Sequence, residues 1–141
     1  MNNYFGTASH IMCYLALAQK EAFLAPSERI AIHLSIYAED VRKLAGLLQQ
    51  KELIVNIKGP GGGYRLAKKA ELISLRDIYE AVEEPNADFW RLKKISLKAK
   101  KPSSNFTEVH NVLDSKLAKA KEDMLHSLSL VSLLEIFGES S

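Results

Sequence analysis

The chain has 141 residues, of which 47% are hydrophobic and 26% are charged, and its formal net charge is +2. A length of ~100–200 residues fits one domain, or one domain with an extension, and the ordinary composition excludes a wholly disordered or collagen-like chain. The near-neutral total charge by itself gives no argument for a nucleic-acid partner.

Three helices are predicted in the first third of the chain. Apolar residues at helical spacing predict the first helix over about 7–21. Ser27 is predicted to be the N-cap of the second helix, with Glu28 in the first turn, where the helix dipole favours a negative charge. The segment 35–37 is predicted to be a turn, and the third helix follows over about 38–51.

A glycine-rich hairpin is predicted after these helices. The β-branched segment 53–58 suits a short strand, 59–63 suits a tight turn, and 64–66 suits a second strand. The glycines allow positive φ angles and leave a slim tip without side-chain bulk. A phosphate-binding loop is excluded, because such a loop requires a helix N-terminus directly after its glycines.

The remaining chain predicts helices around a basic connector. Ser74 and Asp77 resemble a capping box that opens a helix ending before Pro85, and Ser132 resembles the cap of a short terminal helix. No element is predicted for the basic stretch 85–104, which is either a second DNA contact or a solvated linker.

A long helix is predicted from about Asn105, because apolar residues step by three or four positions there. This stripe is longer than one small domain covers, which favours two-fold pairing over folding back on its own domain. The candidate dimerisation residues are Phe106, Val109, Leu113, Leu117, Ala120, Met124 and Leu128.

The segment 27–47 has the pattern of a helix–turn–helix. Apolar residues stand where the two helices pack, and the small Ala31 stands where they cross. Ser35 is the one departure, at a position where glycine is common. An ordinary bundle of amphipathic helices would share the apolar spacing, but a hairpin directly after a helix–turn–helix is the winged-helix order.

Lys58-Gly-Pro-Gly-Gly-Gly-Tyr-Arg-Leu66 resembles the wing signature of the Rrf-type (Rrf-two) family of bacterial winged helix-turn-helix transcription regulators. Segments 5–16, 41–44 and 74–83 resemble the family's first helix, its recognition helix and the helix after its wing. The long helix resembles the family's dimerisation helix. The resemblance implies a mainly α fold with a two-stranded β wing and a long C-terminal dimerisation helix.

This resemblance also implies three parts of the chain. A DNA-binding domain is expected over 1–84, a basic connector over 85–104, and the dimerisation helix with the short terminal helix over 105–141. The charge is divided accordingly, since residues 1–69 carry nine basic and five acidic side chains and residues 85–103 carry six basic and one acidic. The near-neutral total therefore averages a mildly basic head and a basic connector against acidic helices.

The function implied by the resemblance is that of a transcriptional repressor, not an enzyme, which binds a partly palindromic operator in double-stranded DNA as a homodimer. An acidic side chain at the start of the third helix can accept from cytosine, and Arg or Lys can donate to guanine. The alternative for these charged residues is a solvated helix face, which the helix dipole favours for the acidic pair. The candidate DNA-binding residues are Ser35, Tyr37, Glu39, Asp40, Arg42, Lys43, Lys58, Gly61, Gly62, Gly63, Tyr64 and Arg65.

The best-known family members sense iron, nitric oxide or redox state with a cluster held by three cysteines just before the dimerisation helix. The matching stretch 101–110 contains no cysteine, and Cys13 is the single cysteine of the sequence. We therefore expect a cluster-free member with no cofactor and no metal. Cys13 is a candidate redox sensor, with a packed small hydrophobic residue as the alternative, and the effector is not readable.

Two further expectations follow from the residues. The amino-terminal segment lacks the basic start of a signal peptide, and no run approaches ~20 apolar residues, so we expect a protein of the bacterial cytoplasm, associated with the nucleoid when bound to DNA. A competing hypothesis is a winged-helix module that has lost DNA binding and docks a protein. Glu39 and Asp40 beside the expected groove, and the modest net charge, favour this alternative.

Overall fold

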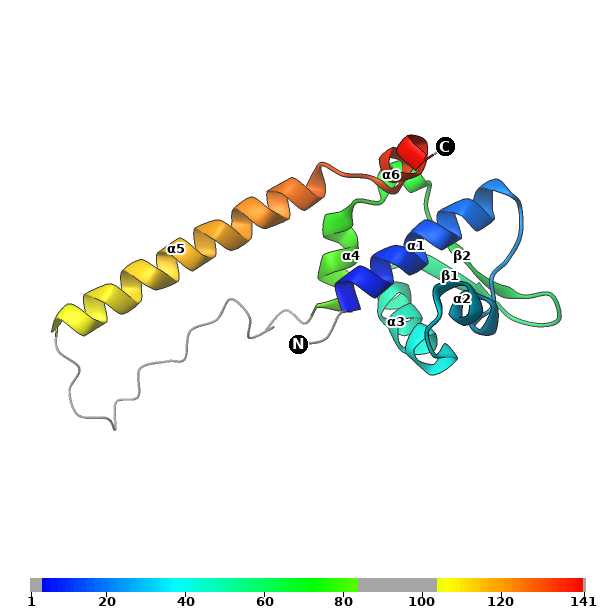
Figure 1. Cartoon of the computed structure of the whole chain (residues 1–141), viewed down its shortest axis with the longest axis horizontal. Helices are drawn as coiled ribbons and strands as arrows, with labels where there is room; N and C mark the ends of the chain where they lie inside the picture. Colours follow the sequence, from blue (N-terminus) through cyan, green and yellow to red (C-terminus); the bar gives the residue numbers. More distant parts are fainter. Residues whose placement is uncertain (1–3, 84–103, 141) are drawn as a thin grey trace.

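The computed structural model describes residues 4–83 and 104–140, and it is mainly helical with one two-stranded antiparallel sheet (Figure 1). The predicted fold class is therefore confirmed. Apart from Ser104, the basic connector lies outside the described residues. The elements in chain order are α1 (Tyr4–Lys20), α2 (Ser27–Leu34), α3 (Ala38–Gln50), β1 (Ile54–Ile57), β2 (Gly63–Leu66), η1 (Ala70–Leu72), α4 (Leu75–Val82), α5 (Ser104–Ser129) and α6 (Leu133–Ser140).

Helix α1 is the centre of the hydrophobic core and contacts α2, α3, α4, α6 and β2. Its side chains at Ile11, Met12 and Leu15 are fully buried. The helix begins three residues before the predicted start, because its first turn also packs on the domain: the ring of Phe5 meets the ring of Tyr79 edge-on, with centroids 5.4 Å apart. Burial of an aromatic ring there stabilises a turn that periodicity alone does not reveal.

Helix α2 begins differently from the prediction. Pro26 is the N-cap, with an extended backbone, and its carbonyl accepts from the amides of Arg29 and Ile30. Ser27 is buried in the first helical position, and no side chain caps the helix. The prediction of Ser27 as the N-cap is wrong because its hydroxyl hydrogen-bonds to Arg42 and Glu28 instead.

The turn between α2 and α3 explains the residue that departs from the helix–turn–helix pattern. Ser35 adopts the left-handed conformation, with φ 56° and ψ 46°. That conformation is natural for glycine and strained for most other residues, which is why glycine is common at this position. The next residue, Ile36, donates its amide to the carbonyl of Ala31 at 3.0 Å and closes the end of α2.

The wing is the hairpin of β1 and β2, whose register runs from Ile54 opposite Leu66 to Ile57 opposite Gly63. The segment before α2 adds to its inner edge. Ala25 and Tyr64 exchange two backbone hydrogen bonds, Tyr64 N to Ala25 O at 2.9 Å and Ala25 N to Tyr64 O at 3.2 Å. The segment before α2 and strand β2 of the wing are therefore joined through backbone hydrogen bonds.

Helices α4, α5 and α6 are joined at a second backbone bridge. The predicted capping box is confirmed, since Ser74 Oγ accepts from the Asp77 amide and Asp77 Oδ2 accepts from the Ser74 amide. Ser74 also bridges Ser132, which follows α5 and whose hydroxyl accepts from the Glu135 amide at the start of α6. The carboxyl end of α5 packs on α4 and buries Leu125, whereas its amino-terminal half projects away from the other helices (Figure 1).

Candidate nucleic-acid interface

The recognition-helix candidates lie on exposed positions at the start of α3. Ser35 in the turn, Tyr37 at the N-cap, and Glu39 and Asp40 in the first helical turn are all exposed. The two carboxylates occupy the helical positions that the dipole favours. This end of α3 lies beside α2, on the side of the molecule away from α5 (Figure 1).

Arg42 is the one basic side chain of α3 that reaches α2. Its Nη1 atom donates to Ser27 Oγ at 3.3 Å and lies 3.5 Å from Glu28 Oε1. Ser27 Oγ in turn donates to Glu28 Oε2 at 3.2 Å. Ser27 and Glu28 cannot be identified from the sequence as neighbours of Arg42, because they lie about fifteen positions away along the chain.

Lys43 faces a different neighbour, the first residue of α1. Its ammonium group donates to the Tyr4 hydroxyl and lies 4.7 Å from the centroid of the Tyr4 ring. The hydrogen bond to Tyr4 raises the pKa of Lys43, so the ammonium group stays charged at neutral pH. Arg42 and Lys43 are adjacent in sequence but are held by α2 and α1 respectively.

The tip of the wing is a turn that requires glycine. Gly59 and Gly61 have φ angles of 98° and 74°, and the Gly62 amide donates to the Gly59 carbonyl at 2.9 Å. A Cβ on Gly62 would lie 2.1 Å from the carbonyl oxygen of Ile57. Apart from the exposed ring of Pro60, the tip therefore presents backbone. The candidate side chains Lys58 and Arg65 flank this tip and are both exposed.

Two other wing candidates are buried. Tyr64 is 8% exposed, and burial raises the pKa of its hydroxyl, an effect that the positive charge of Arg42 partly offsets. A Cβ on Gly63 would lie 2.6 Å from the backbone of Ala25 and Pro26. Gly63 and Tyr64 therefore pack against the segment before α2 and support the wing, whereas Lys58, Gly61 and Arg65 are exposed and Gly62 is half-buried.

The dimerisation candidates divide into two groups along α5. Toward the carboxyl end, Leu117, Met124 and Leu128 are half-buried, while Ala120 is exposed. Toward the amino end, Val109 is 63% exposed and Leu113 45%, and Phe106 is also exposed. Val112 (52% exposed) also belongs to the exposed group, and the buried Leu125 belongs to the group near the carboxyl end. Neither is among the predicted positions, because each lies next to one of them and outside their spacing of three or four residues.

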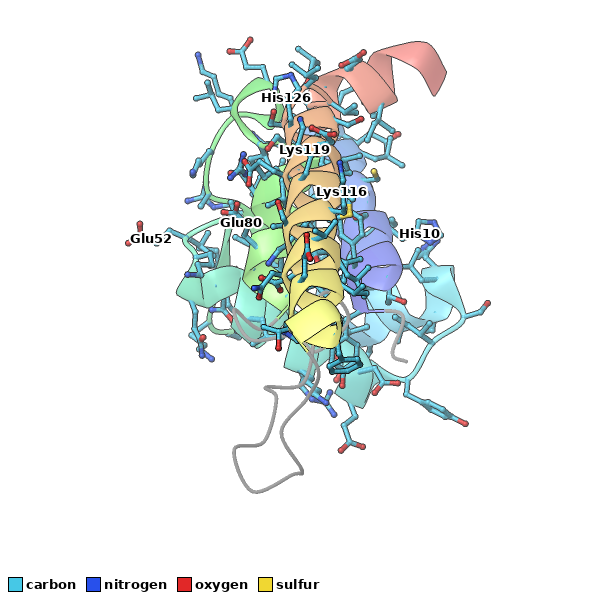
Figure 2. The ribbon with its side chains drawn as sticks, turned by 90° about the vertical axis from the view of Figure 1, so that its left-hand side faces the viewer. His10, Glu52, Glu80, Lys116, Lys119 and His126 are labelled. Carbon is cyan, nitrogen blue, oxygen red and sulfur yellow. The ribbon has the colours of Figure 1, made fainter. Side chains whose placement is uncertain are left out.

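Figure 2 looks toward the projecting end of α5. In this view Glu80 of α4 and His10 of α1 point outward on opposite sides, and Lys116 and Lys119 lie along the helix. Lys119 Nζ pairs with Asp123 Oδ1 at 2.6 Å, so part of the charged surface of α5 is paired within the helix.

Cys13 lies in an open apolar pocket of about 280 Å³ between α1 and α6, which His10 and Phe137 also line. The thiol is half-buried, and burial raises its pKa. A raised pKa lowers the thiolate fraction and hence the reactivity of a cysteine. The surroundings of Cys13 therefore fit a packed residue better than a reactive thiol.

The sequence of almost the whole chain matches one known protein family. The sequence profile of the family Rrf2, described as "Iron-dependent Transcriptional regulator", matches residues 1–139. The chain belongs to the Rrf2 family. Rrf2 is a family of transcriptional regulators and not of enzymes, as the wing signature implied.

Individual Rrf2 relatives agree with this assignment. The HTH-type transcriptional regulator IscR of Cereibacter sphaeroides is 39% identical over 71 residues, which are 50% of this chain and 46% of that protein. The chain thus spans about half the length of the curated relative that it matches. The solved structure of T. potens IscR is 18% identical, has a TM-score of 0.71, and is covered to 88% by the whole chain.

The structure of CymR, the global cysteine regulator of B. subtilis, is also similar. It is 19% identical, has a TM-score of 0.69, and is covered to 98% by the whole chain. At such identities the likeness shows that the fold is shared. It extends over the full length, so the long α5 and the terminal α6 belong to the shared fold together with the winged helix.

The donor set of this chain does not fit the iron–sulfur cluster of the cluster-bearing relatives. Three cysteine ligands are needed for such a site, whereas the sequence has Cys13 alone, and it lies on α1 rather than before α5. Within residues 4–83 and 104–140, no group of three or more His, Cys, Asp or Glu side chains is placed to hold a metal ion. None of the helices in those ranges is long and apolar enough to cross a membrane.

Proposed function

We propose that this Rrf2 protein is a homodimeric repressor that binds a partly palindromic operator without an iron–sulfur cluster. Each α3 would enter a major groove with Ser35, Tyr37, Glu39, Asp40, Arg42 and Lys43 at its exposed end. The wing would approach the neighbouring minor groove with Gly61 and Gly62 at its tip and Lys58 and Arg65 beside it. The observation that carries the proposal is the joining of α2 to β2 through Ala25 and Tyr64, because it fixes the wing relative to the helix–turn–helix.

The homodimer is supported by the apolar surface on the projecting half of α5. Val109, Val112 and Leu113 are each about half exposed or more, and they recur on one side of the helix. A soluble monomer rarely exposes such a stripe, and two-fold pairing of identical helices would bury it on both chains. The half-buried Leu117, Met124 and Leu128 would continue this surface toward the domain.

The cluster-free state is supported by the lack of cysteine donors described above. We assign no effector, and Cys13 is the only cysteine available for a thiol-based signal. Its burial does not favour that role. The site of action would be the bacterial cytoplasm, with the protein on the nucleoid when bound to an operator.

The test begins with selection of bound fragments from the genomic DNA of the source organism. Affinity for a selected fragment should exceed that for random DNA and should fall steeply with salt, because each neutralised phosphate releases counterions. Failure to prefer any fragment over random DNA, even at low salt, would overturn the proposal. Sedimentation of the free protein and of its DNA complex then tests the dimer.

Two matched substitutions separate base reading from phosphate contact. Arg42→Ala should cost ~1–3 kcal/mol at one base position, whereas Arg65→Ala should weaken binding to all sequences and reduce the salt slope by about 1. A uniform loss with Arg42→Ala would reassign this residue to the phosphates.

A protein-docking module without DNA binding remains the second candidate. It is favoured by Glu39 and Asp40, which place two exposed carboxylates on the presumed groove side of α3. This candidate predicts no preference among DNA fragments, and neutralising both carboxylates should then weaken binding to a basic protein surface instead.

A further inference from the structure

Arg42 is held at one edge of its guanidinium group. The two acceptors on α2, Ser27 Oγ at 3.3 Å and Glu28 Oε1 at 3.5 Å, both approach Nη1. The third side of the cluster is the hydrogen bond from Ser27 Oγ to Glu28 Oε2. Ser27 is buried, so this cluster has one fixed member beneath two partly exposed charged side chains.

The cluster joins the start of α2 to α3. The charge of Arg42 lowers the pKa of the buried Tyr64 hydroxyl on β2, and the charge of Glu28 raises it. Ser27 directly follows Ala25 and Pro26, which pack on Gly63 and Tyr64. The position of Glu28 is thus set by the same backbone that fixes the wing.

Contacts at Nη1 leave the opposite edge of the guanidinium group for other acceptors. A guanidinium group has five donors in a rigid fork, and two donors on one edge match O6 and N7 of guanine. With Nη1 engaged, the edge formed by Nε and Nη2 is the one that suits such a contact. An arginine already held in place also loses less rotamer freedom when it binds.

We propose that Glu28 is a positioning residue that orients Arg42 toward a guanine in the operator, so that an acidic side chain on α2 determines the base preference of α3. This inference rests on the proposed function, because it requires an operator. The pair is exposed, with side-chain exposures of 53% for Arg42 and 70% for Glu28, so its effect is modest. We expect loss of the pair to change the discrimination between base pairs about two- to fivefold, which corresponds to the free energy found for exposed ion pairs.

The test compares five variants on a selected operator, on that operator with the base pair read by Arg42 exchanged, and on random DNA. They are Glu28→Gln, Glu28→Asp, Arg42→Ala, the double variant Glu28→Gln/Arg42→Ala, and Glu71→Gln as a control that changes the net charge equally from η1. Glu28→Gln should reduce discrimination between the operator and its exchanged form about two- to fivefold, with little change on random DNA. In the Arg42→Ala background Glu28→Gln should have no such effect, and Glu28→Asp should keep part of the discrimination that Glu28→Gln loses.

A second readout needs no DNA. Nitrogen-15 relaxation of the Arg42 Nε–Hε group in the free protein should show greater mobility in Glu28→Gln than in the wild type or in Glu71→Gln. Unchanged mobility would overturn the inference. So would a Glu28→Gln variant that binds operator and random DNA more tightly by the same factor, because Glu28 would then only repel phosphates.

The two proposals fail in different ways. If the wild-type protein prefers no DNA fragment, the proposed function fails, and the role of Glu28 fails with it. If the wild type discriminates and Glu28→Gln discriminates equally well, only the role of Glu28 is refuted. If Arg42→Ala weakens binding uniformly, Arg42 is a phosphate contact and the inference is refuted while the repressor stands.

Discussion

Gly63 is a position at which one added methyl group should have a large effect on this fold. The residue ends the wing turn, opposite Ile57, and its backbone passes directly over the segment before α2. A Cβ at this position would lie 2.6 Å from Ala25 C and from Pro26 N, and 2.9 Å from Ala25 N. Because these are backbone atoms, which cannot rotate away as a side chain can, Gly63→Ala must push β2 and the segment before α2 apart.

The cost can be worked from the contacts that would be lost. The two hydrogen bonds between Ala25 and Tyr64 are each worth ~0.5–1.5 kcal/mol, and a buried group left without its partner costs ~1–3 kcal/mol. A backbone forced to shift around a new methyl group adds a cost of the kind seen in overpacked cores, ~1–3 kcal/mol. We therefore expect Gly63→Ala to lower the free energy of unfolding by about 3 kcal/mol, a large part of the ~5–15 kcal/mol typical of a domain.

Urea denaturation followed by circular dichroism measures this change, with Gly46→Ala as the matched control. Gly46 lies within α3, and a Cβ there would meet no atom within 4 Å. Alanine is the better helix former by ~0.5–1 kcal/mol, so the control should be stabilised. The reasoning is refuted if Gly63→Ala loses less than about 1 kcal/mol, or if both substitutions shift stability in the same direction.

Three further predictions concern the cap, the long helix and the thiol. Ser74→Ala removes one half of the capping box and should lower stability by ~1 kcal/mol in the same urea assay; an unchanged midpoint would show that the Asp77 half suffices. Leu113→Glu should weaken the proposed dimer by about 2 kcal/mol or more, roughly 30-fold in dissociation constant by sedimentation, whereas Asn111→Glu on the opposite side of α5 should not. Because burial raises the pKa of Cys13, the folded chain holds less thiolate at a given pH. Alkylation of Cys13 should therefore be slower in the folded than in the denatured chain, and the pH midpoint of the alkylation rate should be higher. Equal rates and equal midpoints would contradict this.

The features that the sequence predicts correctly are those that depend on residues close together in the chain. The capping box at Ser74 depends on two residues three positions apart, and both hydrogen bonds form. The strand–turn–strand order depends on the glycines of the wing, and Gly59, Gly61 and Gly63 have positive φ angles there. Ser35 departs from the motif, and it adopts the conformation for which glycine is the usual residue.

Contacts between distant segments were not predictable in the same way. Ser27 has the composition of an N-cap, but Arg42, fifteen residues later, engages its hydroxyl. Tyr64 sits in the wing signature beside exposed residues, but pairing with Ala25 buries it. The sequence predicts a continuous apolar stripe on α5. Packing on α4 instead divides it into a half-buried part toward the carboxyl end and an exposed part toward the amino end.

The bridge between Ser74 and Ser132 holds α5 at its carboxyl end, next to the cap of α4. The helix has 26 residues, so its amino end lies ~39 Å from this anchor at 1.5 Å per residue. Rotation by about 5° at this anchor moves the far end by ~3 Å. In the proposed two-fold dimer, a small repacking beneath Ser132 would change the spacing of the two recognition helices, and with it the separation of operator half-sites that fits them.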